Sequence, residues 1–226
     1  MQSDFSTQLF KALSHERLAA YQNRATEDGH LNLFSHYAWN MALSESLYPV
    51  LQTLEITLRN AIYDAARDHF KRDDWFDDTA IIHYHYNINA LAKAKNTLQR
   101  KRKPLDPGRI IAELTFGFWT SLFDNRYEHG LWRKIIKTTF PHMPKTERTR
   151  QYLSQRFNKI RNLRNRIFHH EPIWHWHDLQ QQHQDILEAL EWLSPEMKEL
   201  VLTVDRFEET YNNGLDNIKT ELGKFC

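Results

Sequence analysis

The sequence is poor in cysteine and has no excess of charge of either sign. Cys226 is the only cysteine among the 226 residues, so no intrachain disulfide can form and a reducing compartment is expected. The 30 basic and 29 acidic residues leave a net charge of only +1. A protein that coats long nucleic acid is usually far more basic, so we expect any contact with RNA to be local.

Long apolar runs are also missing. No stretch approaches the ~18 consecutive apolar residues of a membrane span, and the first residues lack the basic and apolar pattern of a signal peptide. We therefore expect a cytoplasmic protein that does not enter a membrane.

Glycine and proline are scarce, with 6 and 7 residues, and the long stretches between them show helical periodicity rather than alternation. One apolar stripe, for example, recurs at three- and four-residue steps in Leu51, Leu54, Leu58 and Ile62. The sequence predicts one all-α domain over residues 1–226. Its core is expected at about 31–193, with peripheral helices in 1–30 and 194–226.

Punctuating residues suggest where the helices begin and end. Pro49 is expected either to divide residues 31–70 into two helices or to lie in the first turn of the second. Asp106-Pro107 predicts a helix start, with a bend at Gly117 inside that helix. The other expected helices are 6–24, a polar helix ending at 100–103, 146–170, 178–193 and a last one from Ser194-Pro195, with a loop at 73–78.

The densest polar segment is Arg-Asn-Leu-Arg-Asn-Arg-Ile-Phe-His-His-Glu-Pro, residues 161–172. Its spacing of Arg164, Asn165 and His169 resembles the signature of HEPN-superfamily ribonucleases. The flanks of this segment more specifically resemble the Abi-like (abortive infection) branch. Two further blocks are similar to that branch, at 47–61 and 111–119, so the resemblance spans roughly residues 40–175.

The resemblance implies a HEPN-like helical bundle that acts as a homodimeric, metal-independent RNase without a cofactor. It would serve an antiphage, abortive-infection system, under control of an antitoxin or phage trigger that the sequence does not identify. In some relatives a partner nucleotidyltransferase modifies a Tyr two residues beyond the motif His. Glu171 stands there in this chain, which argues against that form of control.

The chemistry of RNA cleavage agrees with this resemblance. A base must take the proton of the 2′-hydroxyl, an acid must protonate the leaving 5′-oxygen, and positive charge must stabilise the phosphorane. Histidine titrates in the right range for proton transfer, and arginine binds phosphate oxygens in a bidentate manner. We therefore expect His169 to transfer protons, Arg164 to stabilise the phosphate and Asn165 to orient the imidazole.

Helical spacing separates these groups. Asn165 and His169 are four residues apart and share a face, and Arg161 extends that stripe by one turn, where it could steer the substrate. Arg164 precedes His169 by five residues, about 140° around the axis of an ideal helix. Either the helix unwinds before Pro172, or two copies of the motif form one composite site across a dimer.

Several residues near the motif have two readings each. His170 is either a second proton-transfer group or a residue that caps the helix end, and Glu171 is a possible accessory group. Glu55, Arg59 and Asn60 form a second polar cluster. Either Glu55 and Arg59 form a structural ion pair at i,i+4, or the cluster holds Arg164 or His169 in place.

Other polar and aromatic clusters are weaker candidates. The pairs His83/His85 and His175/His177 have a His-x-His spacing but no complete set of zinc ligands, so no metal site is predicted. Trp174 and Trp176 either stack on bases or pack structurally. The basic run of residues 100–103 is either a phosphate-contact patch or a solvated helix face; it consists of Arg100, Lys101, Arg102 and Lys103.

The sequence therefore predicts an endoribonuclease that cleaves RNA by 2′-hydroxyl attack. The alternative is a catalytically inactive HEPN-like module that binds RNA or a partner protein.

Overall fold

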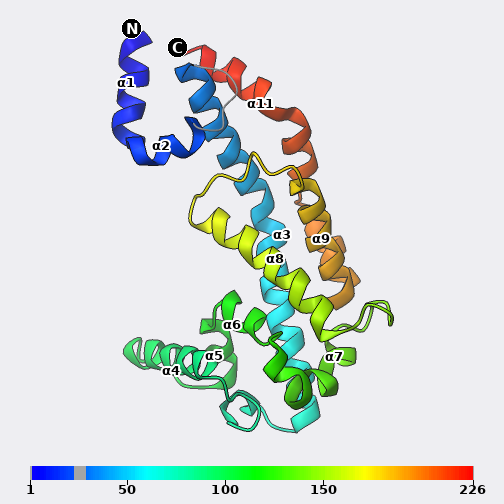
Figure 1. Ribbon diagram of the computed structural model, residues 1–226. Coiled ribbons are helices and arrows are strands. Elements are labelled where there is room, and N and C mark those ends of the chain that lie inside the picture. The colour runs from blue at the N-terminus through cyan, green and yellow to red at the C-terminus, as the bar shows by residue number, and fades with distance from the viewer. Residues whose placement is uncertain (1, 23–28, 226) are drawn as a thin grey trace. The chain divides into compact units, whose positions relative to one another are not determined.

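A computed structural model describes residues 2–22 and 29–225, and every regular element within these ranges is helical (Figure 1). The all-α prediction is confirmed, whereas the HEPN-like arrangement stays a prediction. The helices are α1 Gln2–Leu13, α2 His15–Gln22, α3 His30–Phe70, α4 His85–Arg100, α5 Pro107–Glu113, α6 Phe116–Ser121, α7 Arg133–Thr139, α8 Arg150–Phe168, α9 Leu179–Leu193, α10 Pro195–Leu202 and α11 Phe207–Gly223. Short turns of other types are the 3₁₀-helices η1 Trp75–Asp77 and η2 Asn125–Tyr127 and the π-helix η3 Glu128–Trp132.

The chain forms two compact units, and helices α3, α8 and α9 each contribute residues to both. The first unit comprises Met1–Val50, Leu163–Gln184 and Thr203–Cys226, and the second comprises Leu51–Asn162 and Asp185–Leu202. The organisation into a single domain stays a prediction.

The expected division at Pro49 is wrong, because α3 continues through it as one 41-residue helix (Figure 1). Proline cannot donate the hydrogen bond that the carbonyl of Glu45 would accept, at a cost of about 3 kcal/mol. The apolar side chains on either side, Leu47 and Val50, are completely buried. Burying side chains of this size contributes about 1.5–3 kcal/mol each, which offsets the missing hydrogen bond.

Three other stretches expected as single helices are also divided. The helix expected over residues 6–24 is divided into α1 and α2 at Ser14, where φ is +60°; its expected end near Arg24 lies outside the described residues. The expected last helix is two, α10 and α11.

The third division falls at Thr115, whose extended backbone separates α5 from α6, and not at Gly117. Gly117 lies inside α6, where a Cβ atom would come within 3.3 Å of the Tyr86 hydroxyl. Glycine at this position therefore allows the Tyr86 hydroxyl to approach the helix closely, and it does not mark a bend.

Capping residues confirm several predicted helix starts. The Asp106 carboxylate accepts a hydrogen bond from the backbone of Arg109 at 3.0 Å, and the Ser194 hydroxyl accepts one from Met197 at 3.3 Å. In the predicted loop at 73–78, Trp75 and Phe76 are folded inward and buried.

The first unit is built around a small aromatic and aliphatic cluster. Leu18 and Tyr21 of α2 pack with Leu33 and Phe34 of α3, and Trp174 from the loop after α8 packs against this cluster. The loop that follows the polar motif is thus part of the core of the first unit.

Candidate functional site

The polar motif lies at the C-terminal end of α8, where the backbone forms a Schellman cap. The N–H of His170 donates to the carbonyl of Ile167 at 3.0 Å, and the N–H of Glu171 donates to the carbonyl of Arg166 at 2.8 Å. His170 takes the left-handed conformation of this cap, with a φ of +58°. Glycine is usual at this position, so the histidine costs conformational energy.

An ion pair closes the same cap. The Arg166 guanidinium lies 3.3 Å from the Glu171 carboxylate and 5.4 Å from the centroid of the Trp176 ring. A hydrophobic contact between these two positions often accompanies a Schellman cap, and the ion pair takes its place here. Glu171, an accessory candidate from the sequence, therefore stabilises the turn, with Arg166 as its partner.

Two residues far away in the sequence hold the segment that follows the motif. Arg17 of α2 donates from Nη1 to the carbonyl oxygen of His170 at 2.7 Å. Asn40 of α3 accepts through Oδ1 from the backbone N–H of Ile173 at 2.7 Å and of Trp174 at 3.3 Å. Sequence reasoning missed both residues. For Asn40 the signal was a polar side chain within the richest apolar stretch of the chain.

The two tryptophans after the motif have partners inside the protein. The Trp174 ring packs against His36 and Trp39 of α3, with centroid distances of 4.2 and 6.4 Å. Trp176 lies beside the Arg166 guanidinium. These contacts agree with the structural reading of both residues.

The catalytic candidates differ in exposure. Arg164 is half-buried, with its guanidinium 4.1 Å from the centroid of the Phe168 ring. Asn165 and His169 are exposed, and the N–H of His169 still donates to the carbonyl of Asn165 at 2.9 Å. The helix is therefore regular up to His169, so the side chains of Arg164 and His169 remain about 140° apart around its axis.

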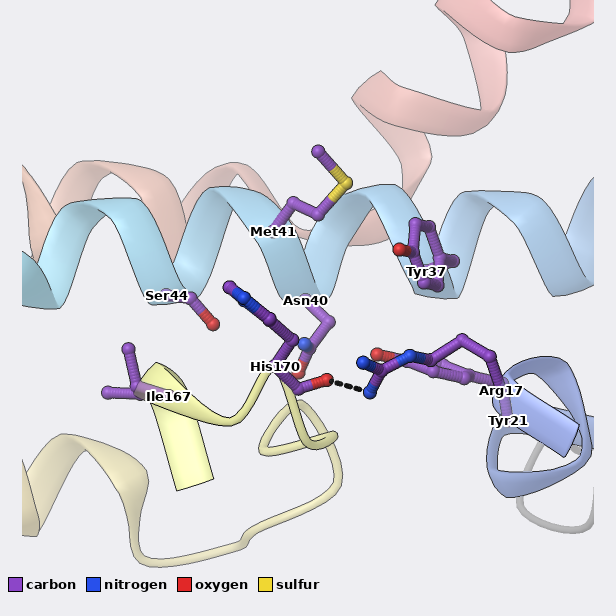
Figure 2. Close-up of a pocket in the computed structure, with 8 residues that line it drawn as sticks. All are labelled: Arg17, Tyr21, Tyr37, Asn40, Met41, Ser44, Ile167 and His170. Carbon is purple, nitrogen blue, oxygen red and sulfur yellow. Dashed lines mark hydrogen bonds between the residues drawn. The ribbon is translucent and has the colours of Figure 1, made fainter. Parts of the chain in front are cut away.

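Two adjoining cavities lie beside the end of α8, and both are lined by Ser44, Ile167 and His170. The first has a volume of about 350 Å³ and extends toward α2 (Figure 2). The second, of about 440 Å³, is bordered by exposed Tyr48 and Phe168, whose ring centroids are 5.8 Å apart. His169 lines neither cavity, so His170 is the motif histidine that borders both of them.

Burial changes the acidity of one group at the first cavity. Burial of the Tyr21 ring, together with the neighbouring Tyr37, raises the pKa of Tyr21 to about 12. Its hydroxyl therefore stays protonated at physiological pH and can donate a hydrogen bond.

A comparison with protein families identifies the group to which this fold and motif belong. The model of the Abi-like protein family matches residues 9–175, well over half of the chain. The chain belongs to the Abi-like protein family. Family membership points to a role in abortive-infection defence. No curated protein and no solved structure matches the chain.

The Abi-like match includes the motif, Arg17 and Asn40, whereas α9, α10 and α11 lie beyond it. None of the described helices is long and apolar enough to cross a bilayer.

The second polar cluster lies on α3 in the second unit. Arg59 is half-buried and donates from Nε to the Asn60 side-chain oxygen at 3.2 Å. Glu55 is half-buried on the same helix, and Arg161 is half-buried on α8. The expected roles of these four residues in positioning or steering stay predictions.

The basic run ends α4 and is exposed throughout. Lys101 forms an ion pair with Glu113 at 3.1 Å, which occupies one of the four cations. Arg102 adopts a left-handed backbone conformation with a φ of +51°. A role of this run in phosphate binding stays a prediction.

The His-x-His pairs do not converge with other ligands. Among the described residues no group of three His, Cys, Asp or Glu side chains is arranged to hold a metal ion. The His83 ring instead lies 5.1 Å from the ring of Tyr127.

Proposed function

We propose that this Abi-like protein is a metal-independent endoribonuclease of an abortive-infection system, with its active site at the end of α8. One observation carries the proposal. The adjacent His169 and His170 are exposed on a backbone that is fixed by the Schellman cap and by Arg17, and a half-buried Arg164 precedes His169 by five residues. Groups for proton transfer and for phosphate binding are thus gathered on one rigid segment.

The reaction needs two proton transfers and one stabilised phosphorane. One histidine takes the proton of the RNA 2′-hydroxyl, and the 2′-oxygen attacks the neighbouring phosphorus. The bond to the 5′-oxygen breaks, and the other histidine protonates that oxygen. The products are a 2′,3′-cyclic phosphate and a 5′-hydroxyl end. Arg164 stabilises the charge on the phosphoryl oxygens, and Asn165 orients the His169 imidazole.

The helical geometry favours a site shared between two copies of the chain. Because α8 is regular up to His169, Arg164 and His169 of one copy point about 140° apart around its axis. A second copy that presents its own motif would bring the Arg164 of one chain to the His169 of the other.

An exposed aromatic surface beside the motif supports such self-association. Tyr48 and Phe168 are 46% and 40% exposed and lie against each other. Aromatic side chains of this kind are enriched at protein interfaces. A two-fold contact through them would place the two copies of the motif next to each other.

A cleavage assay in excess chelator tests the enzyme proposal. Purified protein should cleave mixed RNA in the chelator, and Arg164→Ala and His169→Ala should each lower the rate by a factor of about 10² or more. Matched controls are Arg133→Ala, whose side chain is 65% exposed, and His129→Ala, also at the surface; both should cleave like wild type.

Two other outcomes would indicate a different function. If wild type does not cleave and all variants bind RNA normally, the protein is a binding module. If the chelator alone abolishes cleavage, the reaction depends on a metal.

Expression in cells tests the defence role. Wild type should arrest growth, whereas His169→Ala should not and His129→Ala should. An RNase that is toxic to its own cell needs control by an antitoxin or a phage trigger, so arrest should depend on the level of expression.

A further inference from the structure

The first cavity beside the motif, lined by α2, α3 and the end of α8, has the size of a small-molecule site. Its volume of about 350 Å³ falls within the range of about 300–1,000 Å³ that is usual for ligand pockets. His170 contributes to it at one side, and Figure 2 shows the His170 side chain extending toward α3 beside Ser44. A ligand here would lie directly against the motif.

The lining is chiefly aromatic and apolar. The rings of Tyr21 and Tyr37 meet edge to face, with their centroids 5.3 Å apart. Met41 and Ile167 complete this part of the wall, and Met41 is 59% exposed at the rim. Flat aromatic groups and polarisable sulfur favour a flat, aromatic ligand.

Three polar groups point to hydrogen bonding within this apolar wall. Tyr21 is only 1% exposed, and it lines the cavity together with Ser44. Figure 2 shows the Ser44 hydroxyl on the side of α3 that faces His170. Arg17 uses Nη1 on the carbonyl of His170, which leaves its other N–H groups for an acceptor.

We propose that this cavity binds one nucleobase of the RNA substrate and so sets the sequence preference of cleavage. The proposal rests on the proposed ribonuclease function, because it places in the cavity the base next to the phosphate at which the motif catalyses cleavage. The ring of the base packs against Tyr37 and Met41, and its edge bonds to the hydroxyls of Tyr21 and Ser44. The surface of the cavity is mostly apolar, and Arg17 is the one permanently charged side chain among its lining residues, so the cavity suits a flat, neutral base better than a phosphate.

Binding of single nucleotides tests the cavity without any cleavage. Calorimetric titration of wild type with AMP, GMP, CMP and UMP should show one that binds best. Tyr21→Phe should weaken that nucleotide about tenfold, since it removes one hydrogen bond to the base. Ser44→Leu should abolish binding, because the larger side chain fills the cavity. Tyr211→Phe and Ser154→Leu are matched controls and should bind like wild type.

Sequencing of the cut ends tests the consequence for specificity. Wild type should cut a random single-stranded RNA with a base preference beside the scissile bond that matches the preferred nucleotide. Ser44→Leu should lose that preference, and its melting temperature shows whether the fold is intact.

The outcomes separate the two proposals. Preferential nucleotide binding without RNA cleavage would overturn the ribonuclease function but not the base cavity. Cleavage together with equal binding of all four nucleotides, or with a preference that Ser44→Leu leaves unchanged, would overturn the base cavity alone.

Discussion

A mixing experiment with two inactive variants gives the sharpest test of the shared site. Arg164→Ala keeps His169, and His169→Ala keeps Arg164, so each homodimer lacks one essential group in both of its sites. In a mixed dimer, one of the two sites receives the intact Arg164 from one chain and the intact His169 from the other. The second site of that dimer receives neither.

The expected size of the recovery follows from counting. Equimolar chains that exchange freely form mixed dimers for half of the population, and each has one working site of two, so about a quarter of wild-type activity should return. The assay is cleavage of a fluorescent RNA before and after exchange, with native mass spectrometry to measure the fraction of mixed dimers.

A second mixture tests the shared site through loss of activity instead of recovery. The double variant Arg164→Ala/His169→Ala should form only inactive mixed dimers with wild type, because each site then lacks one group. Adding an equal amount of it should reduce the activity of a fixed amount of wild type to about half. If mixed dimers form and neither recovery nor inhibition occurs, each chain carries a complete site and the composite model is wrong.

Three other perturbations have defined outcomes. In the first, His170→Gly should be about 1 kcal/mol more stable to unfolding than His170→Ala, because only glycine takes the left-handed cap conformation without strain; urea denaturation measures the difference. In the second, Asp205 is paired with buried His183 at 2.7 Å. Burial alone would raise the pKa of Asp205, but the hydrogen bonds from His183 and the Phe207 N–H outweigh it and lower that pKa. The stabilisation is therefore present above the ordinary aspartate pKa near 3.9 and disappears as the pH falls below it. Asp205→Asn should flatten the dependence of the unfolding free energy on pH between about 5 and 2, and an unchanged profile would contradict the pairing. Finally, replacing the cations of residues 100–103 by Gln should weaken RNA binding and make it less dependent on salt. The log–log slope should fall by about 0.7 for each phosphate group that the protein no longer neutralises. Single-turnover cleavage at saturating protein should not change, and the exposed Lys137→Gln is the control.

Local sequence signals predicted most of the helices, and they failed where distant contacts decide. Asp106 and Ser194 act within their own helices, so their capping is readable from three or four residues. At Pro49 the local rule predicted a break, but burial of neighbouring α3 side chains against the rest of the protein prevails. That burial depends on residues distant in the chain, which no local pattern reports.

The candidate site was likewise predictable only in part. The motif residues Arg164, Asn165 and His169 were proposed from the resemblance of the motif and its flanks to the Abi-like family, and they lie at the end of α8. The supports of the motif were missed. Arg17 and Asn40 precede His170 and Ile173 by 153 and 133 residues. Asn40 stands out as a polar side chain in an apolar stretch, but the backbone groups that both residues bind carry no sequence signal.

The structure also bears on whether His170 caps the helix or takes part in the chemistry. A capping role alone would favour glycine, which forms the same Schellman cap without the strain of a positive φ. The cap is already closed by the Arg166–Glu171 ion pair, and the His170 carbonyl, which any residue would supply, is held by Arg17. The imidazole therefore adds nothing that the turn needs, and it is the part of the residue that reaches the cavities. Strained residues of this kind cluster at functional sites, where the rest of the fold holds them in place. The strain and the orientation of the ring together favour His170 as the partner of His169 in proton transfer.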